Sequence, residues 1–283
     1  MLTDIPAVRK IIRFALEEDI GTGDVTTAAI VAPSEMAAAE VIARESGVLA
    51  GIPVAMAVLE EVGPGILCSD AKEDGSAVEP GDVVLRARGP ASRLLTAERV
   101  LLNFVMRLSG IATHTRKFVD ALAATKTIIL DTRKTTPGLR VLEKYAVRMG
   151  GGHNHRMALA DGVLIKNNHI AIGGDLKDTI RKARDGSPSL CRIEVEVRST
   201  DEVKRAVEAG ADVLLLDHMD REEVASVVDY CNWKLKTEAS GNMGVESALA
   251  MAEAGVDYVS AGALTHSAPW LDFSMYLRPL DSE

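Results

Sequence analysis

The stretch CRIEVEVRSTDEVKRAVEAGADVLLLDHM (191–219) carries two short apolar runs separated by a segment with helical spacing. The runs RIEVEV (192–197) and DVLLLD (212–217) have the length and composition of strands. Between them Val203 begins a stripe of small apolar residues at helical spacing, and Gly210 follows as a helix-ending signal. A strand, a helix and a second apolar strand predict two parallel strands covered by a helix.

The same unit recurs along the second half of the chain. VEAGADVLLLD (207–217) is echoed by AEAGVDYVSAG (252–262), and the last four strand candidates start 20–23 residues apart. The six candidates are TIILDTR (127–133), GVLIK (162–166), RIEVEV (192–197), DVLLLD (212–217), KLKTEAS (234–240) and DYVSAG (257–262). An open doubly wound sheet and a closed barrel both fit this alternation. Polar residues at nearly every carboxyl end favour the barrel, because barrel enzymes place their chemistry there.

The first 108 residues have a different pattern. Alternating strands broken by Gly/Pro turns occur in EVIARESGVLAGIP (40–53) and GSAVEPGDVVLRARG (75–89). We predict an α/β protein with an N-terminal α/β sandwich domain over residues 1–108 and an α/β barrel over residues 109–265. Residues 266–283 are expected to return to the first domain. The boundary is placed where Ser109-Gly110 breaks two expected helices, 96–108 and 111–124.

Composition excludes several classes of protein. The chain has 283 residues, 47% of them hydrophobic and 26% charged, which is typical of a globular protein with one large domain or two ordinary ones. Aromatic residues make up only 4%, too few for stacking on single-stranded nucleic acid. The longest uncharged stretches have 14 residues and contain Gly and Pro, whereas a membrane helix needs about 20 apolar residues. Three scattered cysteines and no apolar leader predict a soluble, cytoplasmic protein with reduced thiols.

Charge is unevenly distributed. The net charge is −9, which disfavours nucleic acids and anionic membranes as partners. Residues 131–156 nevertheless hold six bases and two acids, so this window is +4 and the rest of the chain is −13. A solvated helix face accounts for Arg140, Lys144 and Arg148, which are four residues apart. It accounts poorly for the bases beside glycines and strand-like runs, and these indicate a local anion site: Arg133, Lys134, His155 and Arg156.

Acidic side chains lie in and at the end of two neighbouring strands. Glu194 and Glu196 are two residues apart in a strand and therefore face the same way. Buried carboxylates need cations or a metal nearby. Glu196 and Asp217 can together hold Mg²⁺, which accepts one or two protein carboxylates and completes its shell with phosphate and water. Ion pairs with strand-end lysines or arginines are the alternative.

Other strand ends carry groups suited to anions. Lys166 ends its strand and can be a Schiff-base nucleophile, an anion clamp or a structural partner, and the nearby bases favour the clamp. Three glycines in GGGHNHR (150–156) let the backbone approach a ligand beside His155. The turns 240–242 and 261–263 follow the last two strands, where barrels often bind phosphate, although either can be a simple tight loop. The residues of these turns are Ser240, Gly241, Asn242, Ala261, Gly262 and Ala263.

The chain resembles the quinolinate phosphoribosyltransferase family nearly from end to end. The motifs that carry the resemblance are LEEDIGTGDVTT (16–27), ERVLLNFVMRLSGIATHT (98–115), DTRKTTPGLRVLEKYAVRMGGGHNHR (131–156), DGVLIKNNHI (161–170), EVEV (194–197), LLLDHM (214–219), EASGN (238–242) and SAGALTHS (260–267). The resemblance implies an N-terminal α/β sandwich and an incomplete, seven-stranded α/β barrel. It implies transfer of phosphoribosyl from phosphoribosyl pyrophosphate to quinolinate with decarboxylation, giving nicotinate mononucleotide, CO2 and pyrophosphate in NAD biosynthesis.

The resemblance also implies roles for individual residues and a homodimer, or a higher oligomer, with shared sites. The group expected to hold quinolinate is Arg133, His155, Arg156, Lys166 and, donated across the interface, the partner subunit's Arg99. The group expected at phosphoribosyl pyrophosphate is Thr132, Lys134, Glu196 and Asp217, with the turns Ser240–Asn242 and Ala261–Ala263 around the ribose phosphate. Lys134, Glu196 and Asp217 are the expected catalytic residues, and the two carboxylates are the expected Mg²⁺ ligands, directly or through water or pyrophosphate.

Three positions depart from the family pattern that the resemblance implies. The departures are Asn167, His218 and Asn242, where the family has Asp, Asn and Gly.

Three other functions compete with this one. A related pyrophosphorylase associated with molybdate transport shares the barrel, but this chain keeps the whole set of residues expected to hold the two carboxylates. A Schiff-base aldolase depends on Lys166 alone and leaves Arg133 unexplained. A non-enzymatic sugar-phosphate binding module has no use for metal-ready carboxylates.

Overall fold

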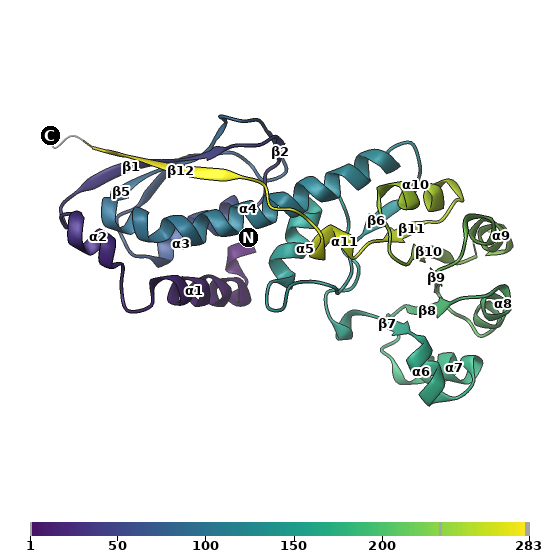
Figure 1. The fold of residues 1–283 in the computed structure, drawn as a ribbon. Helices are drawn as coiled ribbons and strands as arrows, with labels where there is room; N and C mark the ends of the chain where they lie inside the picture. Colours follow the sequence, from purple (N-terminus) through teal and green to yellow (C-terminus); the bar gives the residue numbers. More distant parts are fainter. Residues whose placement is uncertain (1, 232–233, 281–283) are drawn as a thin grey trace. The chain divides into compact units, whose positions relative to one another are not determined.

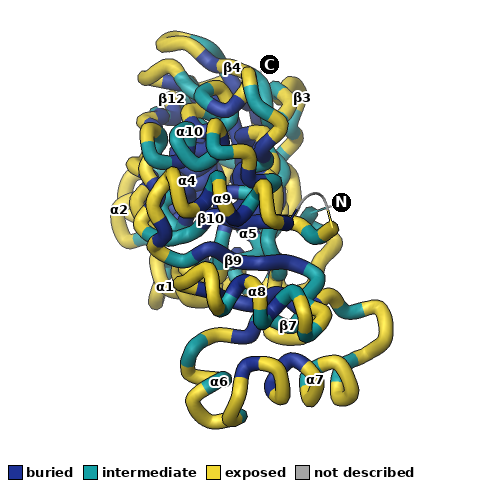
Figure 2. The backbone as a smooth tube through the Cα atoms, turned by 90° about the vertical axis from the view of Figure 1, so that its right-hand side faces the viewer, coloured by how far each residue is buried: buried dark blue, intermediate teal, exposed yellow. Residues whose placement is uncertain are grey.

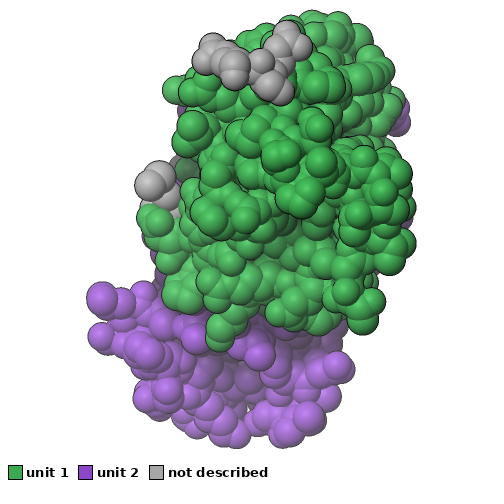
Figure 3. Space-filling view, turned by 90° about the vertical axis from the view of Figure 1, so that its left-hand side faces the viewer, with its two compact units in different colours: residues 1–116, 136–151, 268–283 green, residues 117–135, 152–267 purple. Residues whose placement is uncertain are grey.

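A computed structural model describes residues 2–231 and 234–280, and the chain folds into two compact units. Unit 1 comprises residues 1–116, 136–151 and 268–283, and unit 2 comprises residues 117–135 and 152–267 (Figure 3). The predicted domain ranges 1–108, 109–265 and 266–283 stay predictions, and Met1 and residues 281–283 within them lie outside the described residues. No helix in the described part of the chain is long and apolar enough to cross a membrane.

Unit 1 is built on an antiparallel sheet with the strand order β12-β1-β5-β3. Its strands are β1 (Met36–Ala43), β3 (Leu67–Ala71), β5 (Val83–Pro90) and β12 (Phe273–Pro279), and a separate two-stranded ribbon pairs β2 (Gly47–Val48) with β4 (Ala77–Val78). Along β1 every second residue is buried, the pattern of a sheet with one face on a core. Strand β12, from the end of the chain, pairs with β1, so Met275 lies opposite Val41.

The helices of unit 1 are η1 (Leu2–Asp4), α1 (Pro6–Ile20), α2 (Val25–Ile30), α3 (Ile52–Glu61), α5 (Arg140–Met149) and most of α4 (Ala91–Leu122). The predicted helix break at Ser109-Gly110 is wrong, because α4 runs through it without interruption. Ser109 exchanges hydrogen bonds with the backbone of Ala50, and a Cβ at Gly110 would lie 2.0 Å from the carbonyl oxygen of Pro269. The glycine is therefore required by a close backbone approach and does not end the helix.

Unit 2 contains all six predicted strands, arranged as a parallel sheet in the order β6-β11-β10-β9-β8-β7. They are β6 (Ile128–Leu130), β7 (Val163–Ile165), β8 (Ile193–Val197), β9 (Val213–Asp217), β10 (Lys236–Ser240) and β11 (Tyr258–Ser260). The last strand pairs with the first, as in a barrel, and Leu130 forms a single parallel bridge with His153 on the other side of β6. That bridge occupies the place of a seventh strand. Among the described pairings none joins it to β7, so the barrel is incomplete, as predicted.

Helices cover the outside of this sheet (Figure 1). They are α6 (Asn167–Gly173), α7 (Leu176–Gly186), α8 (Thr200–Glu208), α9 (Arg221–Cys231), α10 (Val245–Glu253) and the short η2 (Leu159–Asp161) and α11 (Ala263–His266). Figure 2 shows β9 buried while α6 and α7 are largely exposed. All five residues of β8 are buried, so both faces of the strand are covered, with the apolar side chains on one face and the acidic ones on the other.

Candidate active site

The polar residues predicted at strand ends gather at the carboxyl edge of the barrel sheet in unit 2. Lys166 directly follows β7, Arg198 follows β8, and Asp217 and Ser240 are the last residues of β9 and β10. Because the strands are parallel, their carboxyl ends lie at one edge, with Asp217 directly opposite Ser240.

Two carboxylates and two cations form the centre of this edge. The Arg198 side chain donates to Asp217 Oδ2 from Nε at 3.0 Å and from Nη2 at 2.7 Å, and its Nη2 also lies 3.5 Å from Glu196 Oε1. Lys166 Nζ lies 3.2 Å from Glu196 Oε2. The bond to Asp217 raises the pKa of Arg198. Sequence reasoning brought Glu196, Asp217 and Lys166 together correctly but missed Arg198, which pairs with both carboxylates.

A second group of cations contains Arg133 and Arg156. Arg156 donates from Nη1 to the carbonyl oxygen of Gly162 at 2.9 Å. Burial, and next the positive charge of Arg133, lower the pKa of Arg156, while Glu194 and Asp161 oppose the shift. Two guanidinium groups close enough to repel each other are costly unless an anion is bound between or beside them. This pair is therefore suited to a ligand with negative charge.

Lys134 lies against the turn that follows β11. Its backbone N–H donates to Thr132 Oγ1 at 3.0 Å, and its carbonyl oxygen accepts from Thr265 Oγ1 at 2.8 Å. A Cβ on Gly262 would be 2.9 Å from Lys134 Cδ and 3.0 Å from His266 Nε2, so a larger residue there would push both side chains aside. The structure thus brings Thr132, Lys134 and the turn 261–263 together, and it adds His266, for which no role was predicted.

The turn after β10 packs on the turn after β9. His218 and Asn242 are the non-glycine residues with positive φ among the described residues, at 57° and 45°. The His218 ring lies against Gly241, where an added Cβ would be 3.1 Å from Nδ1. His218 N–H donates to the Ser240 carbonyl oxygen at 3.4 Å. Both residues occupy the left-handed conformation, which Asn and Gly adopt most readily.

His155 is fixed from both its backbone and its ring. Its N–H donates to Oδ1 of the fully buried Asp131 at 2.9 Å, and Asn154 Nδ2 donates to the other oxygen of Asp131 at 2.6 Å. His155 Nε2 lies 3.1 Å from Glu194 Oε2 and 3.5 Å from Glu238 Oε2. Sequence reasoning gave Asp131 and Glu238 no role. The available signal for Glu238 was its position two residues before Ser240 in the same strand.

Arg99 belongs to unit 1, where it is exposed on α4. Its predicted role across a dimer interface stays a prediction.

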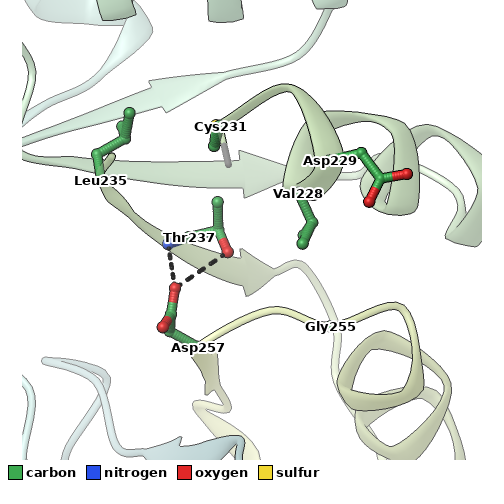
Figure 4. Close-up of a pocket in the computed structure, with 7 residues that line it drawn as sticks. All are labelled: Val228, Asp229, Cys231, Leu235, Thr237, Gly255 and Asp257. Atoms are coloured by element: carbon green, nitrogen blue, oxygen red, sulfur yellow. Dashed lines mark hydrogen bonds between the residues drawn. The ribbon is translucent and has the colours of Figure 1, made fainter. Parts of the chain in front are cut away.

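A cavity of about 110 Å³ lies at the opposite end of the sheet. It is lined by Val228, Asp229, Cys231, Leu235, Thr237, Gly255 and Asp257 (Figure 4). Asp257 precedes β11 and accepts a hydrogen bond from the backbone of Thr237 at 3.0 Å. The cavity therefore adjoins the amino ends of the strands, where barrels place stability and not chemistry.

Comparison with known proteins identifies the family of the chain. Residues 24–109 match the family described as "Quinolinate phosphoribosyl transferase, N-terminal domain", and residues 111–276 match its C-terminal domain. The chain is 43% identical over 271 residues to the "Probable nicotinate-nucleotide pyrophosphorylase [carboxylating]" of Bacillus subtilis, covering 95% of this chain and 92% of that protein. It is 42% identical to the Mycobacterium leprae "Nicotinate-nucleotide pyrophosphorylase [carboxylating]", covering 98% and 100%.

The fold agrees as well. The crystal structure of NadC from Streptococcus pyogenes superimposes with a TM-score of 0.93 at 40% identity, over 96% of both chains. Two matched domains, close relatives along nearly the whole length and a shared fold lead to one conclusion: this chain belongs to the quinolinate phosphoribosyltransferase family.

Proposed function

We propose that this protein transfers the phosphoribosyl group of phosphoribosyl pyrophosphate to quinolinate, forming nicotinate mononucleotide, CO2 and pyrophosphate in NAD biosynthesis. The names of its relatives support the reaction. The single observation that carries it is the set of charge pairs in the barrel unit. Lys166 pairs with Glu196, Arg198 pairs with Asp217, and Arg133 lies close enough to Arg156 for their charges to interact.

The cation cluster accounts for the aromatic acid. Quinolinate carries two carboxylates, and a guanidinium can bind a carboxylate with two parallel hydrogen bonds, which fixes the plane of the ring. Arg133 and Arg156 repel each other, so a dianion bound beside them would relieve this cost. Lys166 and the partner subunit's Arg99 complete the charge balance, and His155 belongs to the same set.

The neighbouring residues account for the sugar phosphate. Lys134, Thr132 and the turns 240–242 and 261–263 hold the phosphate groups. The pyridine nitrogen donates its electron pair to C1 of the ribose while the bond from C1 to the pyrophosphate oxygen breaks and its electrons leave with pyrophosphate. Positive charge develops at C1, and Glu196 and Asp217 stabilise it electrostatically. The pyridinium ring then accepts the electrons released when CO2 departs, and a proton replaces the lost carboxylate.

Glu196 and Asp217 also fit a magnesium ion. Carboxylate oxygens are the donors that Mg²⁺ accepts, and both side chains lie at the edge where the phosphates are expected. Both are paired with Arg198 in this structure, so the ion would compete with that guanidinium or reach the carboxylates through water. When bound, Mg²⁺ would neutralise charge on pyrophosphate.

The competing functions differ in what they require of these residues. A Schiff-base aldolase needs Lys166 as an attacking nucleophile, but Lys166 Nζ lies 3.2 Å from Glu196 Oε2, an ion pair that suits an anion clamp better. A molybdate-associated pyrophosphorylase would use a different acceptor in place of quinolinate. A binding module would bind the sugar phosphate without converting it to product.

We further propose a homodimer in the cytoplasm, with Arg99 donated between subunits. The free thiols Cys68, Cys191 and Cys231 support a reducing compartment. Sedimentation equilibrium checks the dimer, and an Arg99→Ala variant that keeps the dimer should lose affinity for quinolinate. A monomeric active enzyme would contradict the shared site.

The test of the reaction is a comparison of acceptors. The purified protein is mixed with phosphoribosyl pyrophosphate, Mg²⁺ and either quinolinate or nicotinate, and nicotinate mononucleotide is measured by mass spectrometry. We expect product from quinolinate and almost none from nicotinate. Nicotinate lacks the second carboxylate and would therefore leave a cationic pocket without a partner. Equal use of nicotinate, or no product from quinolinate, would refute the proposal.

A further inference from the structure

Three titratable side chains meet inside unit 2 and have no step in the reaction above. Nε2 of His155 lies 3.1 Å from Glu194 Oε2 and 3.5 Å from Glu238 Oε2. Glu194 is only 7% exposed and Glu238 only 2%. Single atoms of the three side chains all lie within 4.8 Å of one another. Two carboxylates buried this closely need either a metal ion or a proton to offset their repulsion.

The hydrogen bonds of His155 indicate that a proton, and not a metal ion, offsets the repulsion between the two carboxylates. Nδ1 of His155 accepts a hydrogen bond from the Arg156 backbone N–H at 2.8 Å, so Nδ1 carries no proton. In a neutral imidazole the other nitrogen is then the donor, and Nε2–H points at the two carboxylates. A nitrogen that carries a proton is not a metal ligand. The ring is therefore arranged to donate to the carboxylates and not to share a metal with them.

The surroundings of Glu194 and Glu238 indicate that one proton lies on this pair. Oε1 of Glu194 and Oε1 of Glu238 are both buried without a hydrogen-bond partner. One proton on the pair turns one acceptor into a donor, which allows the hydrogen bond between the Glu238 and Glu194 side chains. A buried polar atom left without a partner is costly, so this proton lowers the cost of burying the two carboxyl groups.

Glu238 is the side chain that keeps this proton. It is the more buried of the two and lies farther from His155. Glu194 also lies close enough to Arg156 to affect the pKa of that guanidinium. Burial first, and then the charge of Glu194, raise the pKa of Glu238 to about 8, whereas His155 and the hydroxyl of Ser260 act the other way. The remaining charged group at this position, Asp131, is held by its bonds to Asn154 and the His155 backbone.

We propose that Glu238 is a neutral acid which donates a hydrogen bond to Glu194, and that this pair fixes the His155 ring and thereby positions Arg156 for quinolinate. The proposal rests on the proposed function for its substrate. Both ring nitrogens of His155 are engaged, one by Arg156 and one by the carboxylates, so His155 acts on quinolinate through Arg156. Glu238 is accordingly a positioning residue and not a catalytic one.

The pH dependence follows from this arrangement. When Glu238 loses its proton at alkaline pH, two adjacent carboxylates repel each other, and the His155 ring no longer has one fixed position. The KM for quinolinate should then rise, whereas the KM for phosphoribosyl pyrophosphate, whose predicted residues do not include His155 or Arg156, should stay constant.

Two isosteric variants test the proposal. In Glu238→Gln the amide N–H₂ can donate to Glu194 and the amide oxygen can accept from His155, as the neutral acid does. We expect its KM for quinolinate at pH 7 to stay within about twofold of wild type, and its alkaline rise in KM to disappear. Glu194→Gln is the matched control, because it removes the charge that holds His155. It should raise the KM for quinolinate about tenfold at pH 7 and leave the KM for phosphoribosyl pyrophosphate unchanged.

A measurement without substrate separates this proposal from the reaction. Infrared difference spectra of wild type against Glu238→Gln should show the carbonyl stretch of a neutral carboxylic acid at pH 7, and the band should vanish as pH rises. Three results would overturn the proposal: no such band, a Glu238→Gln variant that loses quinolinate affinity at pH 7, or uptake of Zn²⁺ or Mg²⁺ by substrate-free wild type that Glu238→Gln abolishes. If the band is present and quinolinate is not turned over, only the proposed function fails.

Discussion

Replacing Lys166 by methionine removes one cation from the proposed quinolinate site and keeps the length of the side chain. Lys166 Nζ lies 3.2 Å from Glu196 Oε2, and the lysine side chain is 50% exposed whereas the glutamate is 8% exposed. A bound dianion would share this ammonium with Glu196. The substitution therefore removes a charge-assisted contact to substrate and leaves Glu196 with Arg198 as its remaining neighbour.

The size of the effect follows from the half-exposed position. A hydrogen bond to a charged group contributes about 1.5–3 kcal/mol, and solvent screening at 50% exposure favours the lower part of this range. Each 1.4 kcal/mol is about tenfold, so kcat/KM for quinolinate should fall about 10- to 100-fold. Most of the loss should appear in KM, because the ammonium binds the substrate in the ground state as well as in the transition state.

The assay is initial-rate measurement of nicotinate mononucleotide formation over a range of quinolinate concentrations. Lys177→Met is the matched control, since Lys177 forms a similar ion pair with Glu208 on the helices outside the barrel, with 48% of its side chain exposed. It should leave both constants unchanged. The reasoning is refuted if Lys166→Met keeps its KM and loses only kcat, or if borohydride traps a substrate adduct on wild-type Lys166.

Three further predictions concern stability and are read from urea-unfolding midpoints. Gly110→Ala should destabilise by about 1–3 kcal/mol or more, because its Cβ would stand 2.0 Å from a backbone oxygen, whereas Gly186→Ala, with open space around it, should be neutral or slightly stabilising; equal midpoints would contradict this. Arg107→Met should cost about 3 kcal/mol, since it leaves the fully buried Glu143 without the guanidinium 2.6 Å away; a loss under about 1 kcal/mol would show that the pair is dispensable. The pKa of Glu238 is raised, so the folded state keeps a proton that the unfolded chain releases at about pH 4.5. The free energy of unfolding should therefore fall as pH rises from about 4.5 to about 8. Glu238→Gln should flatten this fall, and an unchanged slope would contradict the prediction.

The strands and the edge that holds the site could be predicted because they depend on local pattern. Short apolar runs with helices between them define parallel strands, and parallel strands place their carboxyl ends together. The group formed by Lys166, Glu196 and Asp217 follows from that rule alone. Their partner Arg198 is one residue beyond its strand, and nothing in its local sequence distinguishes it from a surface arginine.

The rest depends on which strands become neighbours. Glu238 is separated from Glu194 by 44 positions in the sequence and from His155 by more, so only the folded sheet reveals their contact. Gly110 looks like a helix break, but its role is a close approach between distant segments. The seventh barrel position is a single bridge at His153, because the next residues are held by side-chain and backbone bonds to Asp131 and do not continue a ladder.

The most direct test of the central claim is to follow the carboxylate that the reaction removes. Quinolinate labelled in the carboxyl group next to the ring nitrogen is incubated with the purified protein and Mg²⁺, with and without phosphoribosyl pyrophosphate. The account predicts labelled CO2 in equal amount to nicotinate mononucleotide, and none when phosphoribosyl pyrophosphate is left out. A nucleotide product that retains both carboxylates, or labelled CO2 released without phosphoribosyl pyrophosphate, would contradict it.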